Sequence, residues 1–170
     1  MDKLIIGFSK SKKKFALYSW LIRFVEGTEF SHAYIRWYSN SLERDVIYQA
    51  SGTMVNFCGR GVFDEHHQVV DEFEVELSAE VKKKVIQYAM DNAGVPYGLK
   101  PALGMGWVRF MKILGYEVPN PFRDGKKTYV CSELVADILV EVLGHDLDHD
   151  LDDVGPRILY DYAKKLKHLE

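Results

Sequence analysis

The sequence has little cysteine, no long apolar run and no excess of positive charge. Its two cysteines in 170 residues cannot form the disulfide framework of a small secreted domain, so the fold must depend on a hydrophobic core. No apolar run approaches the length of a membrane span, so we expect no transmembrane segment. With a formal net charge of −3, the chain lacks the excess of Lys and Arg that nucleic-acid binding requires.

What the chain does contain is typical of one globular domain. Hydrophobic residues make up 47% and aromatic residues 13%, which is sufficient for a packed core. We expect a single domain over residues 1–170. Residues 1–8 hold too short an apolar stretch for a secretory signal, which predicts a cytoplasmic protein. A phage or effector protein released by lysis or by a dedicated system would also lack such a signal.

The spacing of apolar residues predicts an α+β fold. Strands are expected at residues 4–8, 32–38, 45–50, 53–57 and 68–77, the last four in a plausible antiparallel meander. Helices are expected at residues 15–26, 79–92, 101–114, 128–143 and 157–166, the third as a loosely helical apolar insertion. In the fourth helix we expect Glu133, Asp137 and Glu141 to face water.

Cys131 and His32 are the candidate catalytic residues. Cys131 falls in the first turn of the helix predicted at 128–143, where the helix dipole and free N–H groups favour a thiolate. His32 falls in a predicted strand. A thiol that attacks an acyl carbon and an imidazole that carries the proton are the two halves of a cysteine nucleophile site. Taken singly, a helical cysteine is more often a core residue, and a strand histidine is more often structural.

A third polar group usually orients the imidazole of such a site. The strand after the histidine strand offers Gln49, with Asp45 at its start. Neighbouring strands place side chains within about 5 Å of one another, so Gln49 is within reach of His32. Because its amide is uncharged, Gln49 would orient the ring without strongly stabilising an imidazolium ion.

The order of these motifs resembles a known family. The chain is similar to the circularly permuted NlpC-type papain-like cysteine hydrolases, the YaeF/YiiX group, which are relatives of lecithin–retinol acyltransferase. In this permuted branch the histidine strand precedes the cysteine. The matching segments are Phe30-Ser31-His32-Ala33-Tyr34-Ile35, Val46-Ile47-Tyr48-Gln49-Ala50, Gly94-Val95-Pro96-Tyr97, Tyr129-Val130-Cys131-Ser132-Glu133-Leu134-Val135 and Gly155-Pro156-Arg157-Ile158-Leu159.

The resemblance implies a permuted papain-like fold, with an antiparallel sheet packed against the cysteine helix, and a thiol hydrolase or acyltransferase activity. It implies Cys131 as nucleophile and His32 as base. The chain departs from the family pattern at Gln49, where an acidic residue is common, and at Gly98, where an aspartate is often found. Tyr97 and Tyr129 are candidates for lining the substrate cleft, with simple packing as the alternative for each.

No metal or other cofactor is expected. Residues 145–153 begin like a calcium loop, with alternating Asp146, Asp148 and Asp150. The segment lacks both the glycine and the late acidic ligand of such a loop, which favours a solvated loop. His66-His67 has no partner motif and is expected at the surface.

The favoured function is a cysteine peptidase or amidase that cleaves amide bonds in a peptide or peptidoglycan fragment through a thioester. One alternative within the same fold is acyl transfer, or hydrolysis of a lipid ester or amide, with residues 102–114 as an apolar lid. Another is a catalytically inactive binding module, which the uncharged Gln49 would suit. The substrate partner is thus a peptide, a peptidoglycan fragment or an acyl lipid.

Overall fold

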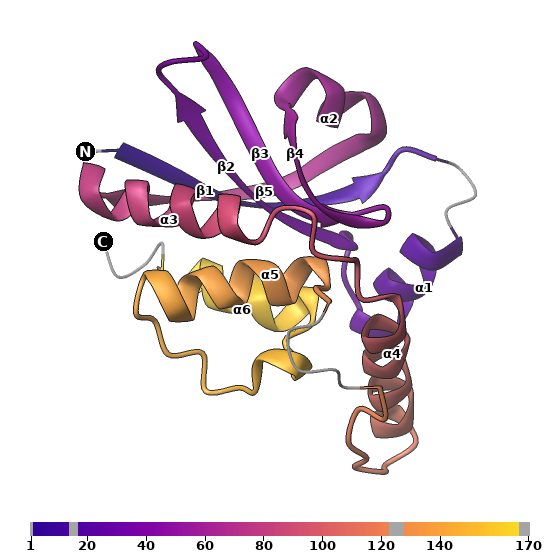
Figure 1. Ribbon diagram of the computed structural model, residues 1–170. Coiled ribbons are helices and arrows are strands. Elements are labelled where there is room, and N and C mark those ends of the chain that lie inside the picture. Colours follow the sequence, from indigo (N-terminus) through magenta and orange to yellow (C-terminus); the bar gives the residue numbers. More distant parts are fainter. Residues whose placement is uncertain (1, 14–16, 123–127, 167–170) are drawn as a thin grey trace.

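The protein was analysed as a computed structural model that describes residues 2–13, 17–122 and 128–166. Five strands form one antiparallel sheet in the order β4-β3-β2-β1-β5 (Figure 1). Their bounds are β1 Asp2–Ser11, β2 His32–Ser39, β3 Arg44–Ser51, β4 Met54–Gly59 and β5 His67–Leu77. All five predicted strands are present; β1 is longer than predicted at both ends, and β4 covers residues 54–59 where residues 53–57 were predicted.

Six α-helices accompany the sheet in the described residues. They are α1 Leu17–Glu26, α2 Arg60–His66, α3 Ala79–Asp91, α4 Leu99–Ile113, α5 Cys131–Asp137 and α6 Pro156–Leu166. α5 continues into a π-helical turn at Ile138–Val142, and Leu151–Asp153 form a 3₁₀ turn. Five of the helices were predicted, whereas α2 was not. Within the described part of the chain, none of the helices has the length and hydropathy needed to cross a bilayer.

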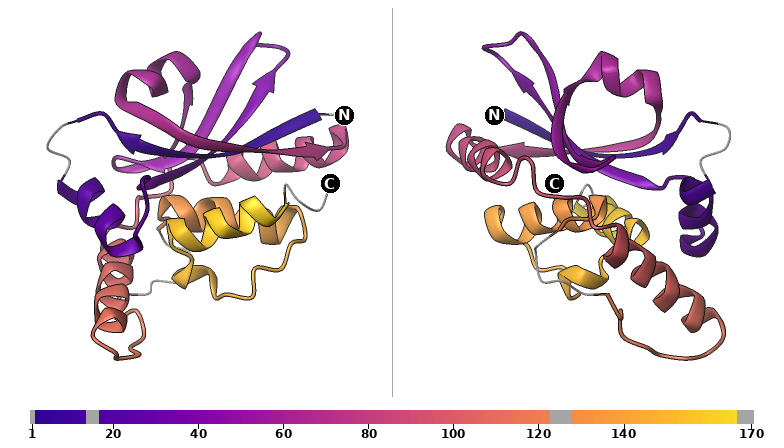
Figure 2. Two further views of the ribbon diagram at one scale, coloured as in Figure 1. Left: turned by 180° about the vertical axis from the view of Figure 1, so that it is seen from behind. Right: turned by 45° about the vertical axis from the view of Figure 1, so that its right-hand side comes forward.

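The helices are distributed unequally over the sheet. α5 and α6 pack below one face, whereas α2 lies over the opposite face (Figure 1). The alternation of side chains along β2 explains both layers, because Ala33 and Ile35 join the core beneath the sheet while Tyr34 packs with Phe63 of α2. α1 and α4 lie together at one end of the molecule (Figure 2). The α+β class is therefore confirmed.

The predicted meander is wrong at its last strand. β5 pairs with β1 rather than β4, so β1 is bordered by β2 and β5. The cause lies in β1 itself, where residues 4–9 are all buried. A strand buried on both faces belongs inside a sheet, and the return of β5 places it there.

The prediction that Glu133 and Asp137 of the cysteine helix face water is also wrong. All seven residues of α5 are buried, including Glu133 and Asp137, while Glu141 is exposed as expected. Each buried acid has hydrogen-bond partners. Glu133 accepts from the backbone N–H of Val130 at 3.2 Å, and Asp137 accepts from the Tyr129 hydroxyl at 2.7 Å. Periodicity misplaced these residues because satisfied polar groups can be buried.

Candidate active site

Cys131 is the first residue of α5 and is only 2% exposed. Its side chain packs with Ala102 and Val130. Burial raises the pKa of the Cys131 thiol, although hydrogen bonds from backbone groups of Ala33, Ser132 and Cys131 itself oppose that shift. The expectation that the helix start would favour the thiolate is therefore wrong for this resting state, because desolvation outweighs the backbone groups.

His32 is the first residue of β2, and its side chain lies on the other side of the β2 backbone from Cys131. It is buried, its Nε2 lies 2.7 Å from Oε1 of Gln49, and its ring centre lies 5.0 Å from that of His67. Burial, followed by the charge of His67, lowers the pKa of His32 to about 3. The ring is therefore neutral near pH 7. With Nε2–H donating to the Gln49 carbonyl oxygen, Nδ1 carries the lone pair that a general base needs.

Gln49 is itself held in one orientation. Its Nε2 donates to Oδ1 of Asn56 at 3.3 Å and approaches Sγ of Cys58 at 3.5 Å. Asn56 then donates to the backbone oxygens of Ser51 and Met54. This chain of donors directs the Gln49 carbonyl toward His32 and so fixes the tautomer of the ring. Asn56 and Cys58 were not predicted as site residues.

The thiol and the imidazole approach one peptide unit from two directions. The backbone N–H of Ala33 contacts the Cys131 sulfur, and Ala33 directly follows His32. The His32 ring lies toward Tyr34 and Phe63, on the α2 side of the sheet. Within residues 2–13, 17–122 and 128–166, no hydrogen bond joins the sulfur to the ring. The fold thus brings the two residues to adjacent backbone positions without bonding their side chains.

An apolar cavity of about 290 Å³ reaches Cys131. Its walls come mainly from α1 and α4, with Cys131 at the sheet end; the lining is Ile22, Val25, Glu26, Ala102, Leu103, Met105, Gly106, Trp107, Phe110, Val130, Cys131 and Pro156. Glu26 is the one charged residue among these, and it pairs with Arg109 at 3.3 Å. The α1 side of the cavity was not predicted, and its helical spacing carried only a signal for packing.

The two predicted cleft tyrosines lie elsewhere. Tyr129 is buried, and its hydroxyl donates to Asp137 rather than reaching the cavity. Tyr97 is half-buried against the core, and its backbone bridges that of Tyr129. Both therefore lie outside the lining of the cavity beside Cys131, and their positions match the packing alternative.

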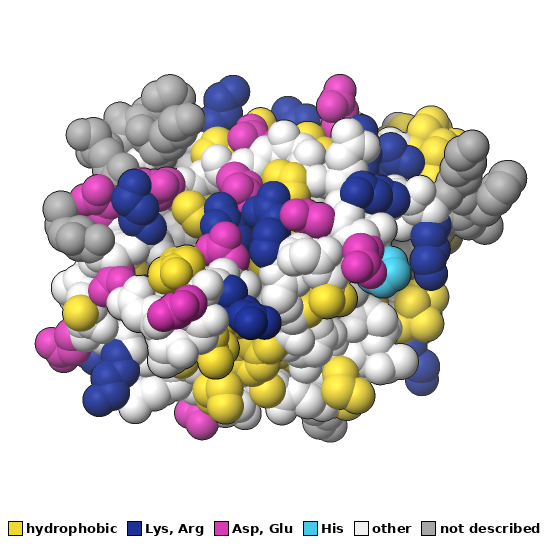
Figure 3. Space-filling model, turned by 90° about the horizontal axis from the view of Figure 1, so that it is seen from above, with side chains coloured by type: hydrophobic (Ala, Val, Ile, Leu, Met, Phe, Trp, Pro, Cys, Tyr) yellow, Lys and Arg dark blue, Asp and Glu magenta, His cyan; other side chains and the backbone are white. Residues whose placement is uncertain are grey.

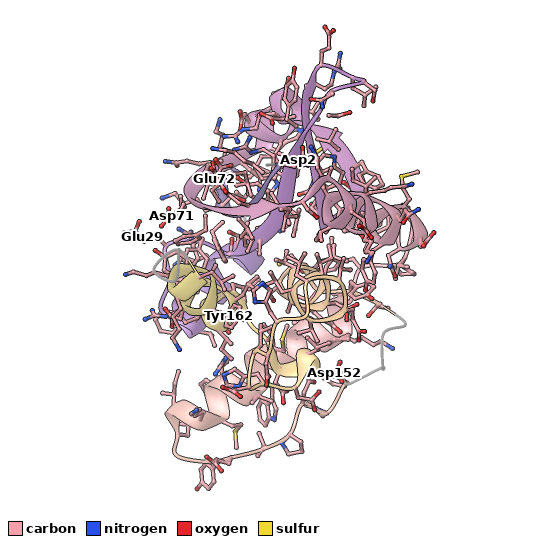
Figure 4. All side chains as sticks on the ribbon, turned by 90° about the vertical axis from the view of Figure 1, so that its left-hand side faces the viewer. Asp2, Glu29, Asp71, Glu72, Asp152 and Tyr162 are labelled. Atoms are coloured by element: carbon pink, nitrogen blue, oxygen red, sulfur yellow. The ribbon has the colours of Figure 1, made fainter. Side chains whose placement is uncertain are left out.

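The acidic residues near the sheet have structural partners. Asp71 and Glu72 of β5 are separated from Asp152, which lies in the helical layer (Figure 4). Glu72 pairs with Arg36 at 2.9 Å and with Arg60 at 2.8 Å. On this upper face of the molecule, acidic and basic side chains alternate (Figure 3). Ion pairing of this kind stabilises the sheet surface and needs no ligand.

Metal-binding residues are not gathered in the described parts of the chain. Among those residues, no group of three His, Cys, Asp or Glu side chains is arranged to hold an ion. Asp146, Asp148 and Asp150 are exposed on a loop. His66 is exposed as expected, whereas His67 is half-buried and lies beside His32.

The buried His32 predicts a specific pH dependence of stability. Its folded pKa of about 3 lies below the unfolded value of about 6.5, so the unfolded chain binds the additional proton. His32 therefore contributes stability fully above about pH 6.5 and loses that contribution as the pH falls toward 3. Urea titrations across this range give the free energy of unfolding at each pH. We expect its slope against pH to be smaller for His32→Gln than for the parent, by an amount that corresponds to close to one bound proton per molecule. His149→Gln, at an exposed site, should match the parent; equal slopes for all three proteins would contradict the assignment.

Comparison with known proteins gives one informative result. No protein-family model matches the chain, and no curated protein sequence matches it. The fold matches the crystal structure of metalloprotein YiiX from Escherichia coli O157:H7, DUF1105, with a TM-score of 0.62 and 19% identity over 95% of this chain and 92% of that chain. At this identity the likeness shows the fold alone. It supports the link to the YiiX group that the sequence motifs indicated.

Proposed function

We propose that this protein is a cysteine-dependent hydrolase or acyltransferase whose substrate carries an apolar acyl chain. The observation that carries the proposal is the position of Cys131 in the wall of the apolar cavity. A nucleophile at the end of such a cavity can meet the carbonyl carbon of an acyl group while the chain occupies the space between α1 and α4. Burial of each methylene would contribute about 0.8 kcal/mol to binding.

The reaction starts from a neutral Cys131 thiol and a neutral His32 imidazole. The Cys131 sulfur attacks the acyl carbon as its proton passes to Nδ1 of His32, and a thioester forms. His32 then gives that proton to the departing alcohol or amine as the original bond breaks. In the second half, water or an acceptor alcohol or amine attacks the thioester, giving its proton to His32, and the thiol is regenerated. Gln49 supports both halves by holding Nε2.

In this structure the His32 ring lies on the α2 side of the sheet and the sulfur on the α5 side, so this mechanism requires Nδ1 and the sulfur to come together past the His32–Ala33 peptide when substrate binds. A buried neutral imidazole and a buried neutral thiol suit a site that transfers the proton during attack, instead of storing an ion pair beforehand. Substrate in the cavity would keep water from that transfer.

The nature of the cavity favours a lipid-like acyl group over a peptidoglycan fragment. Sugars and charged peptides need polar partners, and Glu26, already paired with Arg109, is the one charged residue in the lining. Cleavage of amide bonds remains part of the proposal where the amide carries a fatty acyl chain. A binding module without catalysis is the competing function, and the buried, protonated thiol is the observation that favours it.

A glycine in the cavity wall provides a direct test. Gly106 lines the cavity, and a Cβ added there would meet open space, so Gly106→Leu can fill the cavity without a clash. With acyl esters of increasing chain length, we expect the parent to prefer long chains. In Gly106→Leu, kcat/KM for the long chains should fall about tenfold or more, equivalent to losing about two buried methylenes, while short chains are spared.

Gly61→Leu is the matched control, because Gly61 also lies in a helix with open space around its added Cβ but far from the cavity. It should retain the chain-length preference of the parent. Equal loss on short and long chains, or no loss in Gly106→Leu, would contradict an acyl chain in this cavity. If long-chain substrates bind but no turnover is found under any condition, the protein is a binding module.

A further inference from the structure

The large apolar side chains of α4 lie on the face of the helix that is turned away from the rest of the protein. Pro101, Ala102 and Gly104 are buried. The outward stripe consists instead of large apolar residues three or four positions apart, each about half exposed or more: Leu99, Leu103, Trp107, Phe110 and, just past the helix end, Leu114. Apolar residues at this spacing form a continuous stripe along one side of a helix. The stripe therefore presents an apolar surface to the outside.

α1 extends this surface. Trp20 is 53% exposed and Phe24 is 68% exposed, and their rings stack with centres 5.5 Å apart. α1 and α4 pack together, and the two helices stand at one end of the molecule with α4 projecting from it (Figure 1). We call the exposed apolar residues of these two helices, together with Leu114, the α1–α4 patch. Contiguous exposed apolar surface of this kind marks an interaction site.

The charge of the patch contrasts with that of the whole chain. The two helices carry four basic residues, Arg23, Lys100, Arg109 and Lys112, against one acidic residue, Glu26. The chain as a whole has a net charge of −3. Glu26 is almost fully buried and paired with Arg109, so the charge at the exposed surface of these helices is positive. Positive charge beside exposed Trp, Phe and Leu is the composition of helices that lie in a membrane interface.

We infer that the α1–α4 patch docks on the surface of a lipid bilayer containing anionic lipids. The apolar stripe of α4 would enter the region between headgroups and acyl chains, and the basic residues would face the headgroups. A projecting helix suits penetration of a deformable surface. This inference goes beyond the proposed function, because membrane binding does not require Cys131 to react.

The mouth of the apolar cavity lies within the same surface. Leu103, Trp107 and Phe110 line the cavity and are also about half exposed. An acyl chain could therefore pass from the bilayer into the cavity without crossing water. Docking would place the cavity against the phase in which such a substrate dissolves, which accounts for why these apolar residues remain uncovered.

The test is co-sedimentation with lipid vesicles, using the full chain. We expect the protein to bind vesicles of phosphatidylcholine mixed with phosphatidylglycerol, and to bind pure phosphatidylcholine vesicles about tenfold more weakly. Added salt should weaken binding to the anionic vesicles. The double variant Phe24→Asp, Ile113→Asp changes two exposed positions that do not line the cavity, and we expect it to lower vesicle affinity at least about tenfold.

Val62→Asp, Met90→Asp is the matched control, since both residues are similarly exposed but lie on α2 and α3. It adds the same charge and should bind like the parent, with circular dichroism confirming the fold of both variants. Absence of vesicle binding by the parent, or equal loss in both double variants, would overturn the inference. A parent dimer that the Phe24, Ile113 variant dissociates, without vesicle binding, would instead identify the patch as a self-association surface. Failure of catalysis leaves these outcomes unaffected, because Cys131→Ser should bind vesicles like the parent.

Discussion

Cys131→Ser and Cys131→Ala should each lose the acyl-enzyme thioester and at least about a thousandfold in turnover, because removal of a nucleophile leaves only the contribution of substrate binding. Both changes are small and occur at a site already packed by Ala102 and Val130, so the fold should survive. The measurement is intact-protein mass spectrometry after mixing with a long-chain acyl ester, together with steady-state rates. An acyl adduct that persists in Cys131→Ser would refute the assignment of the nucleophile.

His32 and Gln49 allow the roles within the site to be separated. His32→Ala should lose adduct formation nearly as fully as the cysteine variants, because the buried thiol would then have no base. Gln49→Ala should be milder, at about tenfold to a hundredfold in kcat, since it removes only the group that orients the ring. Peptide mapping that locates the adduct on Cys131 and not on Cys58 serves as the control for general thiol chemistry. Iodoacetamide should alkylate Cys131 slowly at neutral pH, because burial raises the pKa of its thiol.

Asp137→Ala should be strongly destabilising, lowering the free energy of unfolding by about 3 kcal/mol. Asp137 is 1% exposed and accepts hydrogen bonds from the hydroxyls of Tyr129 and Tyr88. Removing the carboxylate takes the shared acceptor from the buried Tyr129 hydroxyl and the half-buried Tyr88 hydroxyl, which lie 3.1 Å apart, and opens a void between α3 and α5. Urea-induced unfolding followed by circular dichroism measures the loss.

A graded series distinguishes the carboxylate from simple packing. Asp137→Asn keeps an acceptor oxygen and should cost less than Asp137→Ala, whereas Tyr88→Phe removes one hydroxyl and should cost about 1 kcal/mol. Glu65→Ala, at an exposed acid on α2, should change stability by no more than about 0.5 kcal/mol. If Asp137→Ala cost no more than Glu65→Ala, the buried cluster would have no net stabilising role.

Many local features of this fold can be predicted from the pattern of residues in the sequence. In the strand predicted at 68–77, Phe73, Val75 and Leu77 alternate with glutamates, a pattern typical of a half-buried strand, and Ser78 is a typical N-cap residue that accepts from Val81 at 3.2 Å. The hydrogen bond between His32 and Gln49 was also predicted, from strand adjacency alone. The same hairpin signal extends one strand further, because a two-residue turn after Ser51 places Asn56 opposite Gln49. Asn56 could therefore have been identified from the sequence.

Other features depend on long-range packing that local pattern does not encode. Periodicity assigned Glu133 and Asp137 to the solvent because it cannot detect a Tyr88 hydroxyl that reaches Asp137 from α3 or a backbone N–H of Val130 that donates to Glu133. The raised pKa of the Cys131 thiol likewise depends on long-range packing. The helix start was visible in the sequence, but the desolvation that dominates its pKa comes from segments remote along the chain. The cavity shares this origin, since its walls come mainly from α1 and α4, which are far apart in the sequence.

The position of β1 between β2 and β5 has a consequence for how the chain reaches this structure. One edge of β1 pairs with β2 soon after the intervening helix, but the other edge pairs with residues 67–77. During synthesis, an amino-terminal strand that is apolar on both faces must wait with one edge open until that later segment leaves the ribosome. The hairpins of β2, β3 and β4 close over short loops and can assemble first. Completion of the sheet is therefore controlled by a late long-range pairing, and premature release of the nascent chain before β5 would leave an aggregation-prone edge.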